Sequence, residues 1–119
     1  MTIYQEIILD HYRSPRNFGI LKKPSRQVAV ANPLCGDKLE FTVKEEKGVV
    51  KKIAFQGEGC AISIAAASLT TEHALGKSKE KLQNLDKNLI LKLLGINLSP
   101  NRVKCALLAW EGLKKVVSD

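Results

Sequence analysis

The fold is decided by residues 38–56, which read KLEFTVKEEKGVVKKIAFQ. Apolar and polar residues alternate in the first part of this stretch, and a period of two is typical of a strand with one buried face. Lys47-Gly48 favours a hairpin turn, after which 49–56 returns as the partner strand. With a shorter strand expected at 27–31, the stretch predicts an antiparallel meander with one face turned inward. The alternating apolar residues are Leu39, Phe41 and Val43.

Helices are predicted on both sides of the meander along the chain. Apolar spacing predicts an amphipathic helix over 2–13, and an alanine-rich segment predicts another over 61–75. Residues 78–94 carry two short helical patterns. A capping hydroxyl followed by proline, Ser99-Pro100, predicts the start of a last helix. The expected buried face of that helix consists of Val103, Leu107, Trp110, Leu113 and Val117.

Length and composition are those of an ordinary globular protein. The 119 residues fit one domain, 1–119, with one core. The apolar runs are too short to span a bilayer, and the first residues do not show the pattern of a signal peptide. We therefore expect a cytoplasmic protein that does not bind membranes.

The chain is basic, with a formal net charge of +7. Its lysines and arginines are dispersed, its few aromatic residues are not interleaved with them, and no nucleic-acid-binding motif is present. The charge therefore indicates an acidic protein partner rather than nucleic acid.

The three cysteines each occupy a special place in this plan. Cys35 and Asp37 lie two residues apart in a loop, where an extended backbone directs both side chains to one face. A soft thiolate beside a hard carboxylate suits zinc or iron. Cys60 follows a glycine-rich turn at a helix start, where the helix dipole favours the thiolate. Cys105 lies near the start of the last helix, beside Lys104.

Two interpretations of the cysteines stay open at this point: metal binding or thiol chemistry, and packing in the core. Each of them alone also suits the role of a small buried apolar residue. Because closely spaced cysteine pairs of the zinc-finger kind are lacking, any metal site must be assembled by the fold. A surface or hydrogen-bonded helical residue is the expected role of His11, and His73 is expected to lie outside the site.

Four ordered motifs resemble the U-type iron–sulfur cluster scaffold family, which comprises IscU, SufU and the N-terminal domain of NifU. The resemblance covers nearly the whole chain. It is carried by Tyr4 to Phe18-Gly19, Asn32-Pro33-Leu34-Cys35-Gly36-Asp37, Phe55-Gln56-Gly57-Glu58-Gly59-Cys60-Ala61-Ile62-Ser63 and Arg102-Val103-Lys104-Cys105-Ala106-Leu107-Leu108-Ala109-Trp110.

The resemblance implies an α+β fold in which a small, mainly antiparallel three-stranded sheet packs against several helices, the SufE/IscU-like sandwich. It implies that Cys35, Cys60 and Cys105 hold a transient [2Fe–2S] cluster, or Zn²⁺ when no cluster is present. Asp37 would be the fourth ligand, and as a harder ligand for iron it would keep the cluster labile. The implied function is that of a scaffold, not an enzyme, which assembles the cluster and transfers it to apo-proteins.

One departure from the IscU pattern keeps an alternative open. Lys104 stands where IscU proteins carry histidine, as it does in SufU. The alternative is a zinc-dependent sulfurtransferase, in which Cys105 or Cys35 accepts persulfide sulfur with Lys104 in support. Against that alternative, the stretch between Cys60 and Cys105 is too short for the extra segment of SufU proteins. A purely structural zinc module is a third hypothesis.

The implied partners are a cysteine desulfurase, which supplies sulfur, and apo iron–sulfur acceptor proteins. A homo-oligomer is a further expectation for the cluster-bound form. The chaperone-binding motif of IscU matches residues 98–102 only at Leu98 and Pro100, with Arg102 a conservative change. This departure argues against a dedicated Hsp70-type chaperone.

Overall fold

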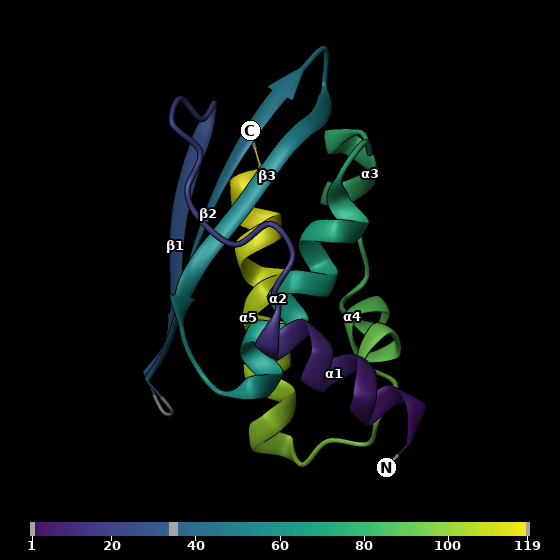
Figure 1. Ribbon diagram of the computed structural model, residues 1–119. Coiled ribbons are helices and arrows are strands. Elements are labelled where there is room, and N and C mark those ends of the chain that lie inside the picture. The colour runs from purple at the N-terminus through teal and green to yellow at the C-terminus, as the bar shows by residue number, and fades with distance from the viewer. Residues whose placement is uncertain (1, 34–35, 119) are drawn as a thin grey trace.

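An antiparallel sheet lies against a layer of helices in the computed structural model, which describes residues 2–33 and 36–118 (Figure 1). The strand order is β1-β2-β3. The fold class expected from the sequence, an α+β sandwich with a small antiparallel sheet, is confirmed. The elements in chain order are α1 (Ile3–Arg13), β1 (Arg26–Asn32), β2 (Asp37–Glu46), β3 (Val49–Glu58), α2 (Ala61–Ala74), α3 (Lys79–Gln83), α4 (Lys87–Leu94) and α5 (Pro100–Val116).

The central hairpin forms as its pattern predicts. Phe41 on β2 is the register partner of Phe55 on β3. Lys47 and Gly48 adopt φ values of 53° and 76°, the left-handed conformation that a tight hairpin turn requires. The strand β3 is longer than expected, because Gly57 and Glu58 continue its pairing with β2. A Cβ atom at Gly57 would collide with the Lys38 carbonyl oxygen, so only glycine fits there.

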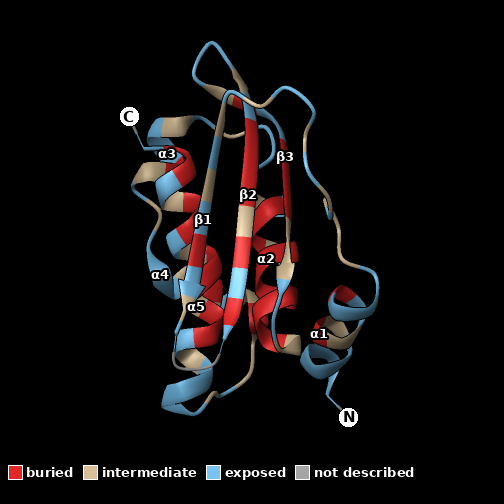
Figure 2. Ribbon diagram, turned by 90° about the vertical axis from the view of Figure 1, so that its left-hand side faces the viewer, coloured by how far each residue is buried: buried red, intermediate tan, exposed pale blue. Residues whose placement is uncertain are grey.

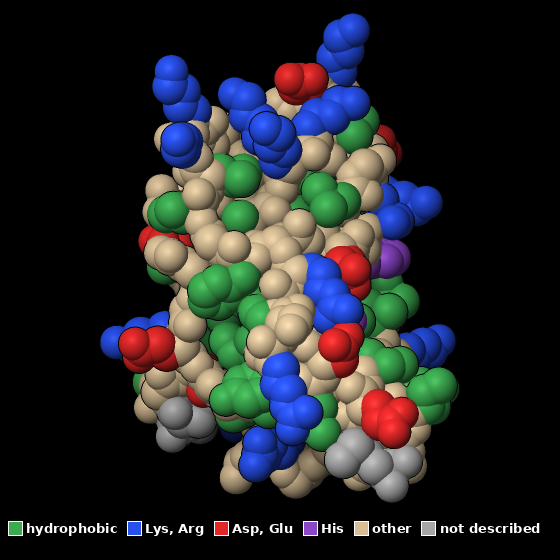
Figure 3. Space-filling model, in the orientation of Figure 1, with side chains coloured by type: hydrophobic (Ala, Val, Ile, Leu, Met, Phe, Trp, Pro, Cys, Tyr) green, Lys and Arg blue, Asp and Glu red, His purple; other side chains and the backbone are tan. Residues whose placement is uncertain are grey.

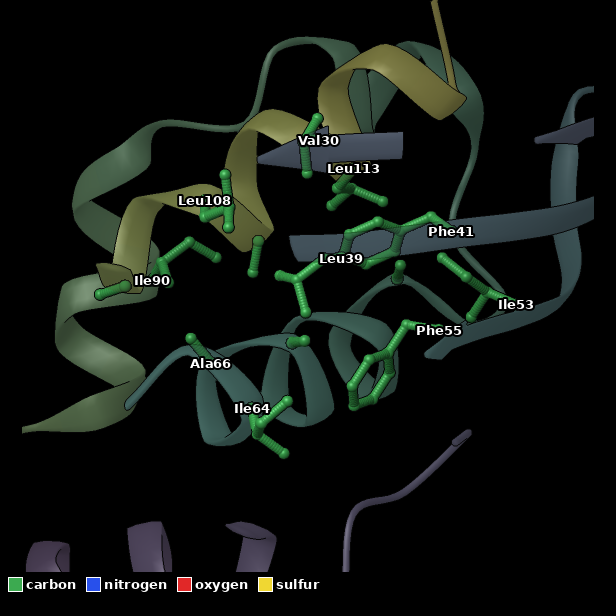
Figure 4. Packing of buried hydrophobic residues seen from close by; sticks show 14 of the residues in the cluster. Val30, Leu39, Phe41, Ile53, Phe55, Ile64, Ala66, Ile90, Leu108 and Leu113 are labelled. Carbon is green, nitrogen blue, oxygen red and sulfur yellow. The ribbon is translucent and has the colours of Figure 1, made fainter. Parts of the chain in front are cut away.

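The core fills the space between the sheet and the two long helices α2 and α5. Leu39, Phe41 and Phe55 are buried on the inner face of the sheet, and Leu113 faces them from α5, whereas Ile64 is buried on the side of α2 that is turned toward α1 (Figure 4). Figure 2 shows buried residues concentrated in β2, β3, α2 and α5, whereas α1 and α4 are mostly exposed or partly exposed. This single cluster holds the ends of β2, α2 and α5 at fixed positions.

The buried face of α5 differs from the one expected. Val103, Leu107 and Trp110 are only partly buried. The face that packs inward is richer in small residues, because α5 lies close to the sheet and a Cβ atom at Gly112 would collide with the Phe41 ring. Its members are Cys105, Ala106, Leu108, Ala109, Gly112, Leu113 and Val116.

The loop between α1 and β1 protects the free edge of β3. Gly19 donates its N–H to the Phe55 carbonyl oxygen at 2.7 Å, and Phe55 donates to the Asn17 carbonyl oxygen at 2.9 Å. The Phe18 ring meets the Phe55 ring edge-on at 5.3 Å. Among the described residues, the helices are all too short or too polar to cross a bilayer.

Candidate metal centre

Three chain segments bring ligand-type side chains together at one end of the sandwich. Asp37 is the first residue of β2, Cys60 is the N-cap of α2, and Cys105 lies in the second turn of α5. One ligand atom from each of these residues lies within 4.8 Å of the other two. Asp37 and Cys105 are buried, and Cys60 is partly exposed. Sequence reasoning expected these three residues to meet, and the structure places them side by side.

Gly59 lets β3 and α2 come close to Asp37. A Cβ atom at this position would lie 3.0 Å from the Cβ of Ser63 and 3.2 Å from the Asp37 carboxylate. These contacts are tighter than most real side chains accept. The backbone N–H of Cys60 consequently reaches the Asp37 Oδ1 atom at 3.3 Å. The glycine before the cysteine therefore shapes the centre as well as the turn.

Ser63 lies at the middle of the cluster. Its hydroxyl donates a hydrogen bond to Asp37 Oδ2. The Ser63 Oγ atom also lies 3.5 Å from the Cys60 Sγ atom and 3.5 Å from the Cys105 carbonyl oxygen. The Cys60 thiol also points at Asp37 Oδ2, at 3.8 Å. A carboxylate, a hydroxyl and a thiol thus share one small polar site beneath the surface.

The surroundings of Cys60 favour its thiolate. Burial raises the pKa of the Cys60 thiol, and hydrogen bonds from the start of α2, among them those of the backbone N–H groups of Ser63 and Ile62, together lower it by more. The negative charge of Asp37 opposes them, but the net shift of the Cys60 pKa is downward. A thiolate is the form that binds metals and attacks electrophilic sulfur. The sequence-based expectation that the helix start favours the thiolate agrees with this direction.

The cluster opens into a surface depression of about 470 Å³. Lys104 and Arg102 line it with positive charge, and both side chains are exposed. Metal-bound thiolates and a carboxylate leave a negatively charged centre, which nearby cations stabilise. The remaining lining residues are Asn32 and Asn101 together with Asp37, Cys60 and Cys105.

The described side chains suit a zinc ion or an iron site. Ligand atoms around tetrahedral zinc lie roughly 3.3–3.8 Å apart, given bond lengths of about 2.0–2.3 Å. The observed spread of up to 4.8 Å is slightly wider, so small side-chain movements would close it. Two sulfur atoms and one oxygen leave a place for a further ligand. Cys35, the fourth ligand expected from the sequence, lies outside the described residues.

The two histidines lie away from this centre, as expected. His11 is buried, and its Nδ1 atom lies 2.7 Å from the Ser68 Oγ atom, so it is a hydrogen-bonded residue of the α1–α2 contact. His73 lies near the other end of α2, where its carbonyl oxygen accepts a hydrogen bond from the Lys77 ammonium group at 2.6 Å.

Comparison with known proteins gives consistent matches. Residues 3–119 match the family described as the NifU-like N-terminal domain. The zinc-dependent sulfurtransferase SufU of Bacillus subtilis is 37% identical over 134 aligned positions, covering 98% of this chain and 90% of the relative. The iron-sulfur cluster assembly scaffold protein IscU of Buchnera aphidicola is 34% identical over 120 positions, covering 98% and 93%. The crystal structure of FiSufU from Fervidobacterium islandicum aligns with a TM-score of 0.82 at 26% identity over 95% of both chains.

Proposed function

The chain belongs to the family of the NifU-like N-terminal domain, and on that premise we propose that it is a scaffold for iron–sulfur cluster assembly. It would build a labile [2Fe–2S] cluster from iron and desulfurase-derived sulfur and pass it to apo-proteins. The observation that carries the proposal is the meeting of Asp37, Cys60 and Cys105 from three separate elements. Cys35 would complete the set of four ligands, and Zn²⁺ would take the same residues in the cluster-free protein.

The mixed ligand set explains how a scaffold can release what it builds. Thiolates bind iron firmly, whereas a carboxylate is a harder and weaker ligand for it. Asp37 is already hydrogen-bonded to Ser63 and to the Cys60 N–H. A carboxylate that leaves the metal would therefore not become a bare buried charge, which is the costly outcome in a protein interior.

Zinc-dependent sulfur transfer is the second candidate, and two observations favour it. Lys104 lines the depression beside Cys105, and a SufU protein named as a zinc-dependent sulfurtransferase is 37% identical to this chain. The thiolate of Cys105 or Cys35 would attack the terminal sulfur of a desulfurase persulfide. The new S–S bond would form as the old one breaks, and the desulfurase cysteine would leave as a thiolate, so no further oxidant is needed.

Alignment length distinguishes this chain from SufU of Bacillus subtilis. The alignment with SufU of Bacillus subtilis runs over 134 positions, which exceeds the 119 residues of this chain, so the relative carries residues without a counterpart here. The alignment with IscU of Buchnera aphidicola runs over 120 positions. Within the aligned region this chain therefore lacks the extra positions of that SufU relative, as the Buchnera aphidicola relative does.

The proposed partners follow from the same chemistry. A cysteine desulfurase would supply sulfur at the open end of the metal centre, and apo iron–sulfur proteins would receive the cluster there. Figure 3 shows Lys and Arg side chains spread over one face, with a group at the end that holds the β2–β3 hairpin. That hairpin end lies far from the metal centre, so the charges that an acidic partner would meet at the centre are Arg102 and Lys104, which line the depression. The affinity of such a partner should fall with salt. Three thiols that must stay reduced suit a cytoplasmic site of action.

Anaerobic purification with metal and sulfide analysis tests the proposal. We expect substoichiometric zinc that iron and sulfide displace, an absorption spectrum of a [2Fe–2S] cluster, and transfer of that cluster to an apo-acceptor. One tightly held zinc, no cluster on reconstitution and faster desulfurase turnover would instead establish the sulfurtransferase. A protein that binds neither zinc nor a cluster would overturn both candidates.

A further inference from the structure

One residue of the candidate metal centre is neither a thiol nor a carboxylate. Ser63 lies three residues after Cys60, which places the two side chains next to each other at the start of α2. Its side chain is fully buried, although serine is usually exposed. The Ser63 Oγ atom contacts Asp37, Cys60 and the backbone of Cys105, so it touches all three segments of the centre.

The hydroxyl of Ser63 has only one proton to donate. Among its contacts, Asp37 Oδ2 belongs to a carboxylate, and a charged acceptor forms the strongest hydrogen bond. The contacts with Cys60 Sγ and the Cys105 carbonyl oxygen are each 3.5 Å long. The proton therefore belongs to the hydrogen bond with the Asp37 carboxylate.

Two donors from the start of α2 together fix the plane of that carboxylate. The Ser63 hydroxyl holds Oδ2, and the Cys60 N–H approaches Oδ1 at 3.3 Å. A carboxylate held at one oxygen alone can rotate about its side-chain bonds, whereas one held at both oxygens cannot. Groups that form hydrogen bonds with a ligating side chain and so orient it commonly influence the affinity of a metal site.

We propose that Ser63 is a positioning residue that holds the Asp37 carboxylate in the orientation in which it joins Cys60 and Cys105 as a metal ligand. The inference deepens the proposed function and rests on the metal centre that this function requires. Ser63 would not bind the metal itself. Its contribution would act through Asp37 and would disappear when Asp37 is absent.

The helix α2 offers a matched control for this idea. Ser68 is as fully buried as Ser63 and also forms hydrogen bonds, but its partners are His11 and the backbone N–H of Arg16. Substitution of either serine by alanine removes one hydroxyl from the same helix. A loss of metal affinity confined to Ser63→Ala would therefore not come from helix stability alone.

A double-mutant cycle on zinc affinity tests the proposal, using competition with a chromophoric chelator. The proteins compared are the wild type, Ser63→Ala, Asp37→Ala, the double variant and Ser68→Ala. We expect Ser63→Ala to weaken zinc binding about 10-fold, a usual loss for an outer partner of a metal ligand. In the Asp37→Ala background the same change should alter the affinity less than about two-fold, since the coupling passes through Asp37. Ser68→Ala should keep the wild-type affinity.

The absorption of Co²⁺ bound in place of zinc gives a second readout, because it reports the ligands rather than stability. Ser63→Ala and Asp37→Ala should shift the Co²⁺ spectrum in the same direction, and Ser63→Thr, which keeps the hydroxyl, should stay nearer the wild type. Equal losses of affinity from Ser63→Ala with and without Asp37 would overturn the proposal. So would a metal-free Ser63→Ala protein that fails to fold, since the role would then be structural. A wild-type protein that binds no zinc would instead refute the metal centre itself.

Discussion

Two buried polar clusters lie along α2, and they serve different purposes. Near the middle of the helix, Ser68 accepts the N–H of Arg16 at 2.9 Å and lies 2.7 Å from His11. At the start of the helix, Ser63 joins Asp37 and Cys60. Both clusters contain a fully buried serine. They differ in what surrounds that hydroxyl.

The His11 cluster pairs nitrogen and oxygen groups that satisfy one another. The Asp37 cluster sets a carboxylate beside two sulfur atoms, and thiols are weak hydrogen-bond partners but strong metal ligands. The first arrangement is complete without anything added, whereas the second gains most from a metal ion. The comparison teaches that the chemical type of the atoms around a buried polar group, more than its burial, distinguishes a structural cluster from a binding centre.

Removal of the thiol at the start of α2 is expected to have the largest effect. Cys60→Ala should abolish stable binding of zinc and of a cluster, an affinity loss of at least about 100-fold, because one of few strong ligands is gone. The metal-free protein should keep its fold, since Cys60 is only partly buried. Metal analysis and thermal unfolding measure the two effects. Normal metal content in the purified variant would show that the Asp37 cluster is not the binding centre.

The reciprocal change should disrupt the His11 cluster and leave metal binding intact. His11→Ala removes a buried ring that fills the α1–α2 contact, and we expect a loss of about 2–3 kcal/mol in the free energy of unfolding. Zinc affinity should stay within about two-fold of the wild type. Denaturant unfolding of the metal-free protein measures the loss. Tyr12→Ala, a change at the next and exposed residue, serves as control and should cost much less.

Asp37→Ala sharpens the comparison through kinetics. We expect the cluster to persist several-fold longer in the presence of an apo-acceptor, because the weakest iron ligand is the one an acceptor displaces first. The absorbance of the cluster, followed during transfer, measures this lifetime. Faster loss than in the wild type would mean that the carboxylate retains the cluster rather than releasing it.

The smallest expected effect is the response of stability to pH. Burial lowers the pKa of His11, and Arg16 lowers it further, so the folded protein favours the neutral ring. The unfolded chain then binds more protons than the folded one near pH 6, and the stabilisation is present above the ordinary histidine pKa of about 6.5 and is lost as the pH falls through the lower folded value. His11→Gln should flatten the unfolding free energy between about pH 7 and pH 5. An unchanged slope would assign the acid sensitivity to other groups.

The sequence predicted most of the framework because its signals are local. Alternation in β2 and the Lys47-Gly48 turn specify the hairpin, and Ser99-Pro100 specifies the start of α5. The buried face of α5 was wrong in part, because large apolar residues were weighted over Ala106, Ala109 and Gly112. How closely two layers approach is a property of the whole fold, and a single helix pattern does not contain it.

The candidate centre was predictable only as far as its residue types stand out. Asp37, Cys60 and Cys105 were singled out because thiols and a loop carboxylate suggest chemistry. Ser63 was quoted only as the last residue of a family motif and was given no role at the centre, since a serine in an alanine-rich helix carries no signal of its own. The one clue was its spacing of three residues from Cys60 at a helix start, which becomes informative once Asp37 is known to lie opposite.

The positions of the three ligands within their elements have a consequence for local opening. A strand end, a helix cap and an early helical turn are the parts of a native protein that open most readily on their own. A metal shared by all three would tie these openings together, so that one end could not open without releasing the ion. Metal binding would then appear in amide hydrogen exchange as slower exchange at the starts of α2 and α5. The tip of the β2–β3 hairpin, at the far end of the sandwich, would exchange at its former rate.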